Sequence, residues 1–352
     1  MKAIVLKEFG GPEVLRLEEV PTPVPGEGEI LLKVHSVSVN RTLDLVVRRG
    51  DYPSDVRLPL VLGVDPSGVV VAAGEEVERP RVGERVAVIS MIACGQCRYC
   101  RAGEEALCQK SRHIGVHRWG GYAEYVAVPA ASAFPIPAGL SFAEATVITR
   151  HFPMAFNLLS SKANLQADEW VLIMGAAGAL GSCGAQVGKL LGAKVIAGAG
   201  SDERVAAALG YGADFGINYR RQELAPEVMK LTDGKGADVV FENIADPTLW
   251  PGSFNSLAWA GRLVTAGGHG GGQVTLDVKR LYLRRMRIIG AAGTNRRDVE
   301  RSLQVAAAGK IRAIIDRTMP LREAAPAHRV LEEERILGKI ILDPTLESRA
   351  PD

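Results

Sequence analysis

Residues 169–200 read EWVLIMGAAGALGSCGAQVGKLLGAKVIAGAG, and this stretch decides the fold of one half of the chain. It holds an apolar strand, a glycine-rich turn, a helix and a second apolar strand, in that order. The same alternation continues through ADFGINY (213–219), ADVVFENI (237–244), GRLVTAGG (261–268) and MRIIGAAG (286–293). Buried apolar strands that alternate with helices are typical of a parallel, doubly wound sheet. We therefore predict an α/β nucleotide-binding domain over residues 146–292.

A glycine-rich turn follows the first of these strands, with the pattern G-x-x-G-x-x-G at Gly175, Gly178 and Gly181. Glycine lets the backbone turn sharply and approach a pyrophosphate, and the N-terminus of the next helix offers unpaired N–H groups. A tight turn without a ligand is the alternative, but the strand–turn–helix–strand order favours a dinucleotide. We expect Gly175, Gly178, Ala179, Leu180 and Gly181 to contact it.

The end of the second strand distinguishes NAD from NADP, because an acid there would bind the ribose 2′-hydroxyl and select NAD. Ala199 and Gly200 occupy that place. Ser201 and Arg204 follow and offer a hydroxyl and a guanidinium to a 2′-phosphate. Asp202 is the rival acid, but it lies beyond the strand, where we expect it to cap the next helix. NADPH is the predicted cofactor.

The first third of the chain has a different residue pattern, in which short predicted strands are separated by Gly and Pro. The strands are AIVLKEF (3–9), EVLRLEEV (13–20), EILLKVHSVSV (29–39), GVVVAAG (68–74) and RVAVIS (85–90). Frequent turns and period-two alternation predict an antiparallel, barrel-like domain over residues 1–145. Residues 293–352, which include HRVLEEERILGKIILDP (328–344), are expected to rejoin it, and LESRAPD (346–352) reads as a frayed end.

Four cysteines lie in the stretch CGQCRYCRAGEEALC, at Cys94, Cys97, Cys100 and Cys108. Four thiolates from one short loop can close a tetrahedral shell around Zn²⁺, and a closed shell leaves no position for substrate. Two disulfides or four reduced thiols are the alternatives. The chain starts at the alternating strand MKAIVLKEF, so we expect no targeting peptide and a reducing, cytoplasmic location, which disfavours disulfides. The spacing predicts one structural zinc.

Composition narrows the function classes. The 352 residues are 47% hydrophobic and 23% charged, with a net charge of +2. This balance argues against nucleic acid and against a polybasic membrane anchor as partners. Since no apolar run reaches about 18 residues, we expect no transmembrane helix. A two-domain enzyme is the prediction from length.

Several segments together resemble the medium-chain dehydrogenase/reductase superfamily, which includes zinc alcohol dehydrogenases and quinone oxidoreductases. Besides the cysteine loop, they are LPLVLGVDPSGVVVAAGEEV (58–77), VGERVAV (82–88), GGYAEY (120–125), GAAGALGS (175–182) and LGKIILDP (337–344). The resemblance implies a GroES-like β-barrel catalytic domain plus a Rossmann domain, a small carbonyl, enone or quinone substrate, and a homodimer or homotetramer. It also implies that Arg204 and Tyr219 surround a 2′-phosphate, as in the NADP-dependent quinone reductases.

The chain departs from the zinc alcohol dehydrogenases at the ligands of their catalytic metal. Asn40 and Arg41 stand where those enzymes have a Cys, Asp65 ends the segment that corresponds to their Gly-His-Glu motif, and Thr149 stands at the third ligand position. Without these ligands a Lewis-acid zinc cannot be held there. The fifth cysteine, Cys183, is expected to be a small core residue of the nucleotide-binding helix.

The candidate catalytic residues are Tyr52, Asn40, Thr42, Arg41 and His151. By resemblance to quinone reductases, Tyr52 in RRGDYP would donate a hydrogen bond or a proton to the substrate; a surface turn is the alternative. Asn40 would help to hold the substrate carbonyl, and Thr42 would relay a proton or simply end a strand with a satisfied hydroxyl. Arg41 is either a cation beside the lost metal position or a solvated loop residue. Asp65 is expected to be a structural hydrogen-bond acceptor.

The pair Arg150-His151 interrupts an otherwise apolar segment at the predicted domain junction. It either orients an anionic or carbonyl substrate, with His151 as proton donor, or tethers the junction. A metal site rebuilt from His151 with Asp65 or His35 is the remote alternative. His269 follows a sheet strand near the expected nicotinamide side, but a flexible glycine loop explains it more simply.

These observations predict an NADPH-dependent oxidoreductase that reduces an activated C=C bond or a quinone by hydride transfer without catalytic zinc. The first alternative is a zinc-independent carbonyl reductase or alcohol dehydrogenase, with Arg41 or His151 polarising the carbonyl. The second is a non-catalytic NADPH-binding sensor or scaffold.

Overall fold

The computed structural model describes residues 1–268, 270–333 and 336–346, so His269 and residues 347–352 lie outside the described part. The chain divides into two compact units. One comprises Met1–Arg150 and Asn295–Asp352, and the other comprises His151–Thr294. The two boundaries between the units, after Arg150 and after Thr294, lie within five residues of the boundaries predicted after residues 145 and 292. The C-terminal segment belongs to the same unit as the N-terminal segment.

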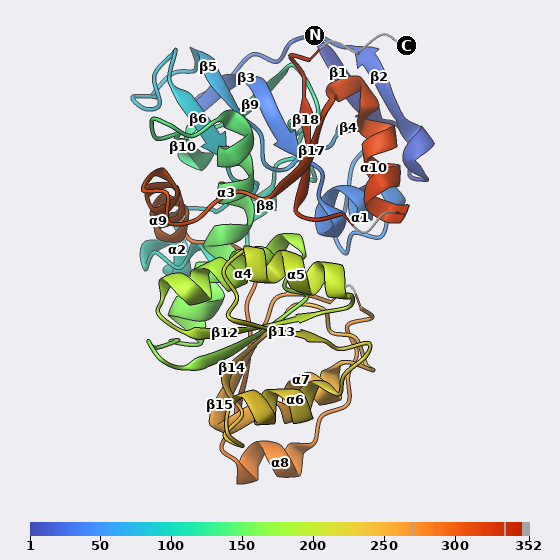
Figure 1. Ribbon diagram of the computed structural model, residues 1–352. Helices are drawn as coiled ribbons and strands as arrows, with labels where there is room; N and C mark the ends of the chain where they lie inside the picture. The colour runs from blue at the N-terminus through green and yellow to red at the C-terminus, as the bar shows by residue number, and fades with distance from the viewer. Residues whose placement is uncertain (269, 334–335, 347–352) are drawn as a thin grey trace. The chain divides into compact units, whose positions relative to one another are not determined.

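The second unit is built on a six-stranded parallel sheet with the order β13-β12-β11-β14-β15-β16 (Figure 1). The strands are β11 (Trp170–Met174), β12 (Lys194–Ala199), β13 (Phe215–Asn218), β14 (Ala237–Glu242), β15 (Leu257–Thr265) and β16 (Arg287–Gly290). The strand order reverses between β11 and β14, which makes the space beyond their carboxyl ends the expected ligand position of a doubly wound sheet.

Helices cover both faces of this sheet. They are α4 (Ala179–Leu190), α5 (Asp202–Gly210), α6 (Leu224–Leu231), α7 (Trp250–Asn255) and α8 (Val278–Leu283). In Figure 1, α4 and α5 lie on one face, and α6 and α7 lie on the other. The central strands are mostly apolar because both faces of the sheet are buried; Leu172, Ile196 and Val240, for example, are fully buried. The predicted Rossmann architecture is confirmed.

The first unit is a largely antiparallel β structure in which β3 is central. One sheet has the order β10-β6-β5-β3-β18-β17, with β9 also paired to β3, and a second has the order β2-β1-β4. The strands are β1 (Lys2–Leu6), β2 (Leu15–Glu19), β3 (Glu29–Ser38), β4 (Leu60–Val61), β5 (Ser67–Ala73), β6 (Arg85–Val88), β7 (Met91–Ile92), β8 (Arg112–His113), β9 (Tyr125–Pro129), β10 (Ala133–Pro135), β17 (Ile315–Pro320) and β18 (Lys339–Asp343). The predicted GroES-like barrel is confirmed, and β18 brings the C-terminal segment beside β3.

Short helices join these strands. They are α1 (Val46–Arg49), α2 (Arg98–Arg101), α9 (Arg296–Ala307) and α10 (Ala324–Glu333), while α3 (Phe142–Phe156) runs from the first unit into the second. A π-helix over Arg41–Leu45 follows β3 directly. No helix in the described ranges is both long and apolar enough to span a bilayer.

Candidate functional site

Asn40 is the centre of a buried polar network at the end of β3. Its side-chain oxygen accepts hydrogen bonds from Nζ of Lys339 at 2.6 Å and from Nε of Arg150 at 3.2 Å. Its Nδ2 group donates to Oδ2 of Asp44 at 3.1 Å and to Oδ2 of Asp65 at 3.2 Å. The amide orientation follows from these charges, since the reverse orientation would place an NH₂ group against two cations.

The π-helix explains how Asp44 enters this network. The backbone N–H of Leu45 donates to the carbonyl of Asn40, five residues back, at 3.2 Å. One extra residue in the turn places the Asp44 carboxylate beneath the start of the helix, where it accepts from the backbone N–H of Asn40 at 2.8 Å and from that of Gly63 at 3.0 Å. Such π-turns occur frequently at functional sites.

The second carboxylate of the network, Asp65, is held by Ser38. The Ser38 backbone N–H donates to Oδ1 of Asp65 at 2.9 Å, and its hydroxyl donates to Oδ2 at 2.5 Å. Asp65 is 1% exposed. The structural acceptor role expected of Asp65 therefore matches its contacts.

Two carboxylates and two cations meet around one amide, so the charges of the network balance. Burial and, next, the negative charge of Asp65 raise the pKa of Asp44 to about 6. Asn40 itself is 1% exposed, and its Nδ2 group is directed at acceptors within the protein. This geometry suits a positioning residue better than a donor to substrate.

Tyr52 lies beside a histidine pair that sequence reasoning missed, His113 and His117 of SRHIGVHRW. The Tyr52 ring is half-buried and meets the His117 ring edge-on at 6.1 Å between centroids, and burial raises the pKa of Tyr52. Nδ1 of His117 accepts the backbone N–H of His113 at 2.9 Å, so neutral His117 carries its proton on Nε2 and donates to the Ser54 hydroxyl at 2.9 Å.

Arg150 links this histidine pair to the Asn40 network. Burial and then the charge of Arg150 lower the pKa of His113 to about 4, so His113 is neutral at pH 7. Arg150 therefore contacts Asn40 through Nε and also places its positive charge near His113. The only sequence signal for His113 and His117 was their four-residue spacing.

Other candidates from the sequence lie elsewhere. Arg41 is exposed and donates to the carbonyl of Leu331 on α10, and Thr42 is exposed on the π-helix. The His35 ring stacks on Phe142 at 4.5 Å. His151 follows Arg150 on α3 but belongs to the second unit.

The four clustered cysteines are arranged as a metal site. Their sulfur atoms all lie within 4.8 Å of one another. Among the described His, Cys, Asp and Glu residues, no other group of three or more has its ligand atoms this close together. The Cys97–Cys100 and Cys94–Cys100 sulfur separations are 3.5 and 3.9 Å. Four Zn–S bonds of about 2.3 Å at tetrahedral angles require sulfur separations of about 3.8 Å. The cysteines are free thiols rather than disulfides, and the set fits one zinc ion.

The glycine-rich turn connects β11 to α4 as predicted. Gly175 has φ +62°, a conformation that favours glycine, and Gly178 is the N-cap of α4. A Cβ atom at Gly181 would lie 2.2 Å from the carbonyl oxygen of Gly175, so the helix packs against the turn only with glycine there. These are the features that let a backbone cradle a pyrophosphate.

Two cationic side chains and one phenol lie at the end of β12 and at the glycine-rich turn. A Cβ atom placed on Gly200 would lie 3.1 Å from the Tyr219 hydroxyl and 3.4 Å from Nε of Arg220. A Cβ atom on Gly178 would lie 3.9 Å from a terminal nitrogen of Arg204, so this guanidinium reaches the turn. Sequence reasoning missed Arg220, although it adjoins Tyr219 in the chain.

The expectation that Asp202 caps α5 is wrong. Ser201 is the N-cap, with its hydroxyl accepting from the backbone N–H of Arg204 at 3.3 Å, and Asp202 is the first helical residue. The Asp202 carboxylate accepts from Nδ2 of Asn218 at 2.6 Å and pairs with Arg221. Serine takes the cap because its hydroxyl is one residue closer to the strand end.

Cys183 is 2% exposed inside α4, in agreement with a core role. Two buried polar side chains of this unit, Asn243 and Glu242, stabilise strand ends. Nδ2 of Asn243 donates to the carbonyl of Met174 at 2.8 Å, and the Glu242 carboxylate accepts from the backbone N–H of Ala245 at 2.8 Å. Burial raises the pKa of Glu242.

Two family models match the chain. The alcohol dehydrogenase GroES-like domain matches residues 26–138, and the zinc-binding dehydrogenase domain matches residues 179–308. The first covers β3 to β10 of the barrel with the cysteine loop, and the second covers most of the Rossmann sheet.

Similar proteins match along their whole length. An NAD-dependent alcohol dehydrogenase of Sulfolobus acidocaldarius is 34% identical, with 98% of this chain and 100% of the relative covered. An acryloyl-coenzyme A reductase of Metallosphaera sedula is 31% identical, with 97% and 99% covered. A solved structure of an NAD-dependent alcohol dehydrogenase has a TM-score of 0.91 at 36% identity and covers 97% of this chain and 99% of its own.

Proposed function

This chain belongs to the zinc-binding, GroES-like dehydrogenases of the medium-chain dehydrogenase/reductase superfamily, and from that premise we propose that this oxidoreductase uses NADPH to reduce a C=C bond conjugated to a carbonyl. The observation that carries the proposal is the Arg150 guanidinium, anchored at Nε on Asn40. It provides a fixed positive charge beside the positions where a catalytic zinc would have its ligands.

Charge develops on the carbonyl oxygen during such a reduction. The nicotinamide cofactor, when bound, supplies a hydride to the β-carbon of the substrate. We infer that Arg150 stabilises the resulting enolate oxygen through its terminal N–H groups, because a preoriented cation is most effective where charge appears only in the transition state. Tyr52 donates the second hydrogen bond, or the proton that completes the product.

Asn40, Asp44, Asp65 and Lys339 act through Arg150 in this proposal. Lys339 holds the Asn40 carbonyl in the orientation that receives Nε of Arg150, and the two carboxylates hold the opposite end of the amide. The network thus positions a cation without itself touching substrate.

The substrate class rests on similarity to the acryloyl-coenzyme A reductases, whose names describe reduction of an unsaturated acyl thioester. We propose an α,β-unsaturated acyl thioester, enone or quinone. The alternative, a carbonyl reductase or alcohol dehydrogenase, is favoured by the relatives named as alcohol dehydrogenases. We also propose one structural zinc on the four cysteines, and a homodimer or homotetramer.

NADPH is proposed over NADH because Tyr219 and Arg220 lie at the end of β12 and the Arg204 guanidinium reaches the glycine-rich turn. The nearby acid Asp202 is engaged by Asn218 and Arg221. Several relatives are named NAD-dependent alcohol dehydrogenases, and comparing NADPH with NADH as cofactor tests whether this chain differs from them.

The test is an activity comparison on purified protein. NADPH oxidation should proceed with an unsaturated thioester, cyclohexenone or benzoquinone, and faster than alcohol-driven NADP⁺ reduction. Arg150→Gln should lower kcat by about a hundredfold if the cation supplies about 3 kcal/mol. Exposed Arg81→Gln, in the same unit, is the matched control. Faster turnover of saturated alcohols than of enones would favour the alcohol dehydrogenase alternative.

A further inference from the structure

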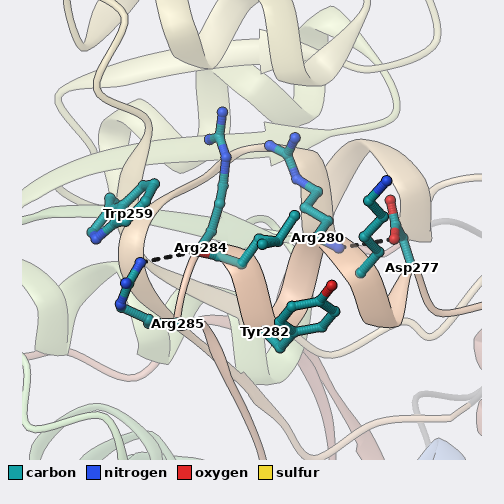
Figure 2. Close-up of a pocket in the computed structure, with 8 residues that line it drawn as sticks. Trp259, Asp277, Arg280, Tyr282, Arg284 and Arg285 are labelled. Atoms are coloured by element: carbon teal, nitrogen blue, oxygen red, sulfur yellow. Dashed lines mark hydrogen bonds between the residues drawn. The ribbon is translucent and has the colours of Figure 1, made fainter.

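A pocket lies in the α/β unit, at the amino-terminal ends of β15 and β16, and Figure 2 shows it. Its volume is about 670 Å³, and its lining residues are Trp259, Asp277, Lys279, Arg280, Tyr282, Leu283, Arg284 and Arg285. The glycine-rich turn follows the carboxyl end of β11. Because the strands are parallel, the pocket and this turn lie at opposite ends of the strands. It shares no residue with the cofactor site.

The pocket is strongly cationic. Four cations and one carboxylate line it, a balance of +3 (4 − 1) in a chain whose total is +2. Arg280 and Arg284 are four residues apart, and their side chains extend in the same direction in Figure 2. Like charges at this spacing repel each other, so the arrangement is destabilising unless an anion lies between them.

Arg280 is held in place but incompletely bonded. One of its terminal nitrogens donates to the carbonyl of Asn255 at 3.1 Å, and its backbone N–H donates to the Asp277 carboxylate at 2.9 Å. Its Nε is buried and has no hydrogen-bond acceptor among the described atoms. A buried donor without an acceptor destabilises the folded state, and a hydrogen bond to a bound oxyanion would remove that penalty. Burial and then the charge of Arg284 lower the pKa of Arg280.

Two aromatic side chains complete the pocket. Trp259 is 62% exposed and Tyr282 is 63% exposed, which is unusual for side chains of this size. The Arg285 guanidinium lies 5.0 Å from the Trp259 ring centroid and donates to the carbonyl of Leu283 at 3.0 Å. The Arg285 guanidinium thus holds the Trp259 indole in place from one side. The exposed part of the indole offers a surface on which a planar group can stack.

We propose that this pocket binds an organic phosphate with a planar ring, of the nucleoside phosphate class, with the phosphate on Arg280 and Arg284 and the ring on Trp259. A guanidinium pair binds phosphate oxygens with charge-assisted, bidentate hydrogen bonds. A multiply charged phosphate also offsets the +3 balance better than a single carboxylate does. This site is additional to the cofactor site and independent of the proposed reaction.

Binding is tested on the full-length protein by calorimetric titration with two probes, inorganic pyrophosphate and AMP. Wild type should bind AMP at two sites per chain, one at the glycine-rich turn and one in the pocket. The double variant Arg280→Gln/Arg284→Gln should retain only the first. Its affinity for pyrophosphate, measured with the glycine-rich turn occupied by saturating NADPH, should fall at least tenfold. Trp259→Phe should weaken AMP more than pyrophosphate, since only AMP has a ring to stack.

Arg287→Gln is the matched control, because Arg287 is exposed on β16 and does not line the pocket. NADPH affinity and melting temperature, measured on every variant, establish that each is folded; if the double variant is not, Arg284→Gln alone is compared. A single AMP site in wild type would refute the proposal, as would unchanged affinities in the arginine variants. Dissociation of an oligomer by the double variant, without any change in phosphate binding, would identify the pocket as a contact between copies instead.

Discussion

Nζ of Lys339 donates a 2.6 Å hydrogen bond to Oδ1 of Asn40, although the two residues are 299 positions apart in the chain. The same ammonium donates to the carbonyl of Val39 at 2.9 Å and is 3% exposed as a residue. A buried ammonium is stable only when it is paired, and here it faces the amide that also binds Asp44 and Asp65. Strand β18 therefore supplies the cation that orients the candidate active site.

Replacing this lysine tests the network. Lys339→Met should lower the free energy of unfolding by about 3 kcal/mol or more, because the two buried carboxylates would then face only Arg150. Urea unfolding measures the change. Lys33→Met, at an exposed position of β3, is the control and should change stability by less than about 0.5 kcal/mol. Equal stability of both variants would mean that the Lys339 ammonium contributes nothing to the network.

The network should also make stability depend on pH. The folded-state pKa of Asp44, about 6, is above the usual 3.8 of the unfolded chain. Between these values the folded state binds more protons, so stability should fall as pH rises from about 4 to about 6 and stay lower above that. Asp44→Asn should flatten this decline, whatever its effect on absolute stability. Asp55→Asn, an exposed control, should preserve the slope; a decline that persists in Asp44→Asn would assign it to another group.

The cysteine cluster predicts the metal content. We expect about one zinc per chain by elemental analysis, and Cys97→Ser should reduce it. Chelation should lower the melting temperature more than it lowers the initial rate, because a closed shell of four thiolates does not contact substrate. Two zinc ions per chain would require a second site and overturn the metal-free mechanism proposed here.

The side chains at the end of β12 predict nucleotide preference. Arg204→Gln should weaken NADPH by roughly 1.5–3 kcal/mol and leave NADH nearly unchanged, if the guanidinium bonds the 2′-phosphate. Arg220→Gln should have the same direction of effect, since its Nε lies beside Gly200. Arg221→Gln is the control, because its guanidinium pairs with Asp202 instead. Equal losses for the two nucleotides would place the 2′-phosphate elsewhere.

Tyr52 and His151 are the two candidate proton donors, and substitutions at each distinguish them. Tyr52→Phe should lower kcat by about tenfold while leaving NADPH binding intact, because its hydroxyl matters mainly once charge reaches the substrate oxygen. His117→Gln should produce part of this loss, since its ring packs against Tyr52. An unaltered rate in Tyr52→Phe together with a collapsed rate in His151→Ala would transfer the role to His151.

Local signals were sufficient for the two-domain architecture. The apolar strands, the glycine spacing and the four cysteines are each confined to a few dozen residues, and short-range geometry dictates what they form. Accordingly, Gly175 has the left-handed backbone conformation of a tight turn, and the four sulfur atoms lie within 4.8 Å of one another. The prediction for the N-cap of α5 was wrong because Ser and Asp are both favourable N-cap residues. Which of Ser201 and Asp202 caps the helix depends on the exact residue at which the helix begins.

The polar network around Asn40 could not be predicted from the sequence. Asn40, Asp65, Arg150 and Lys339 are scattered from β3 to β18, and no periodicity or motif relates them. The sequence by itself determined the fold class, the turn that suits a nucleotide and the thiolate cluster. Only the tertiary structure decided which distant charges meet around Asn40. A buried charge is stable only when it is paired, and the packing of β3, β18, α3 and the π-helix decides which partners are within reach.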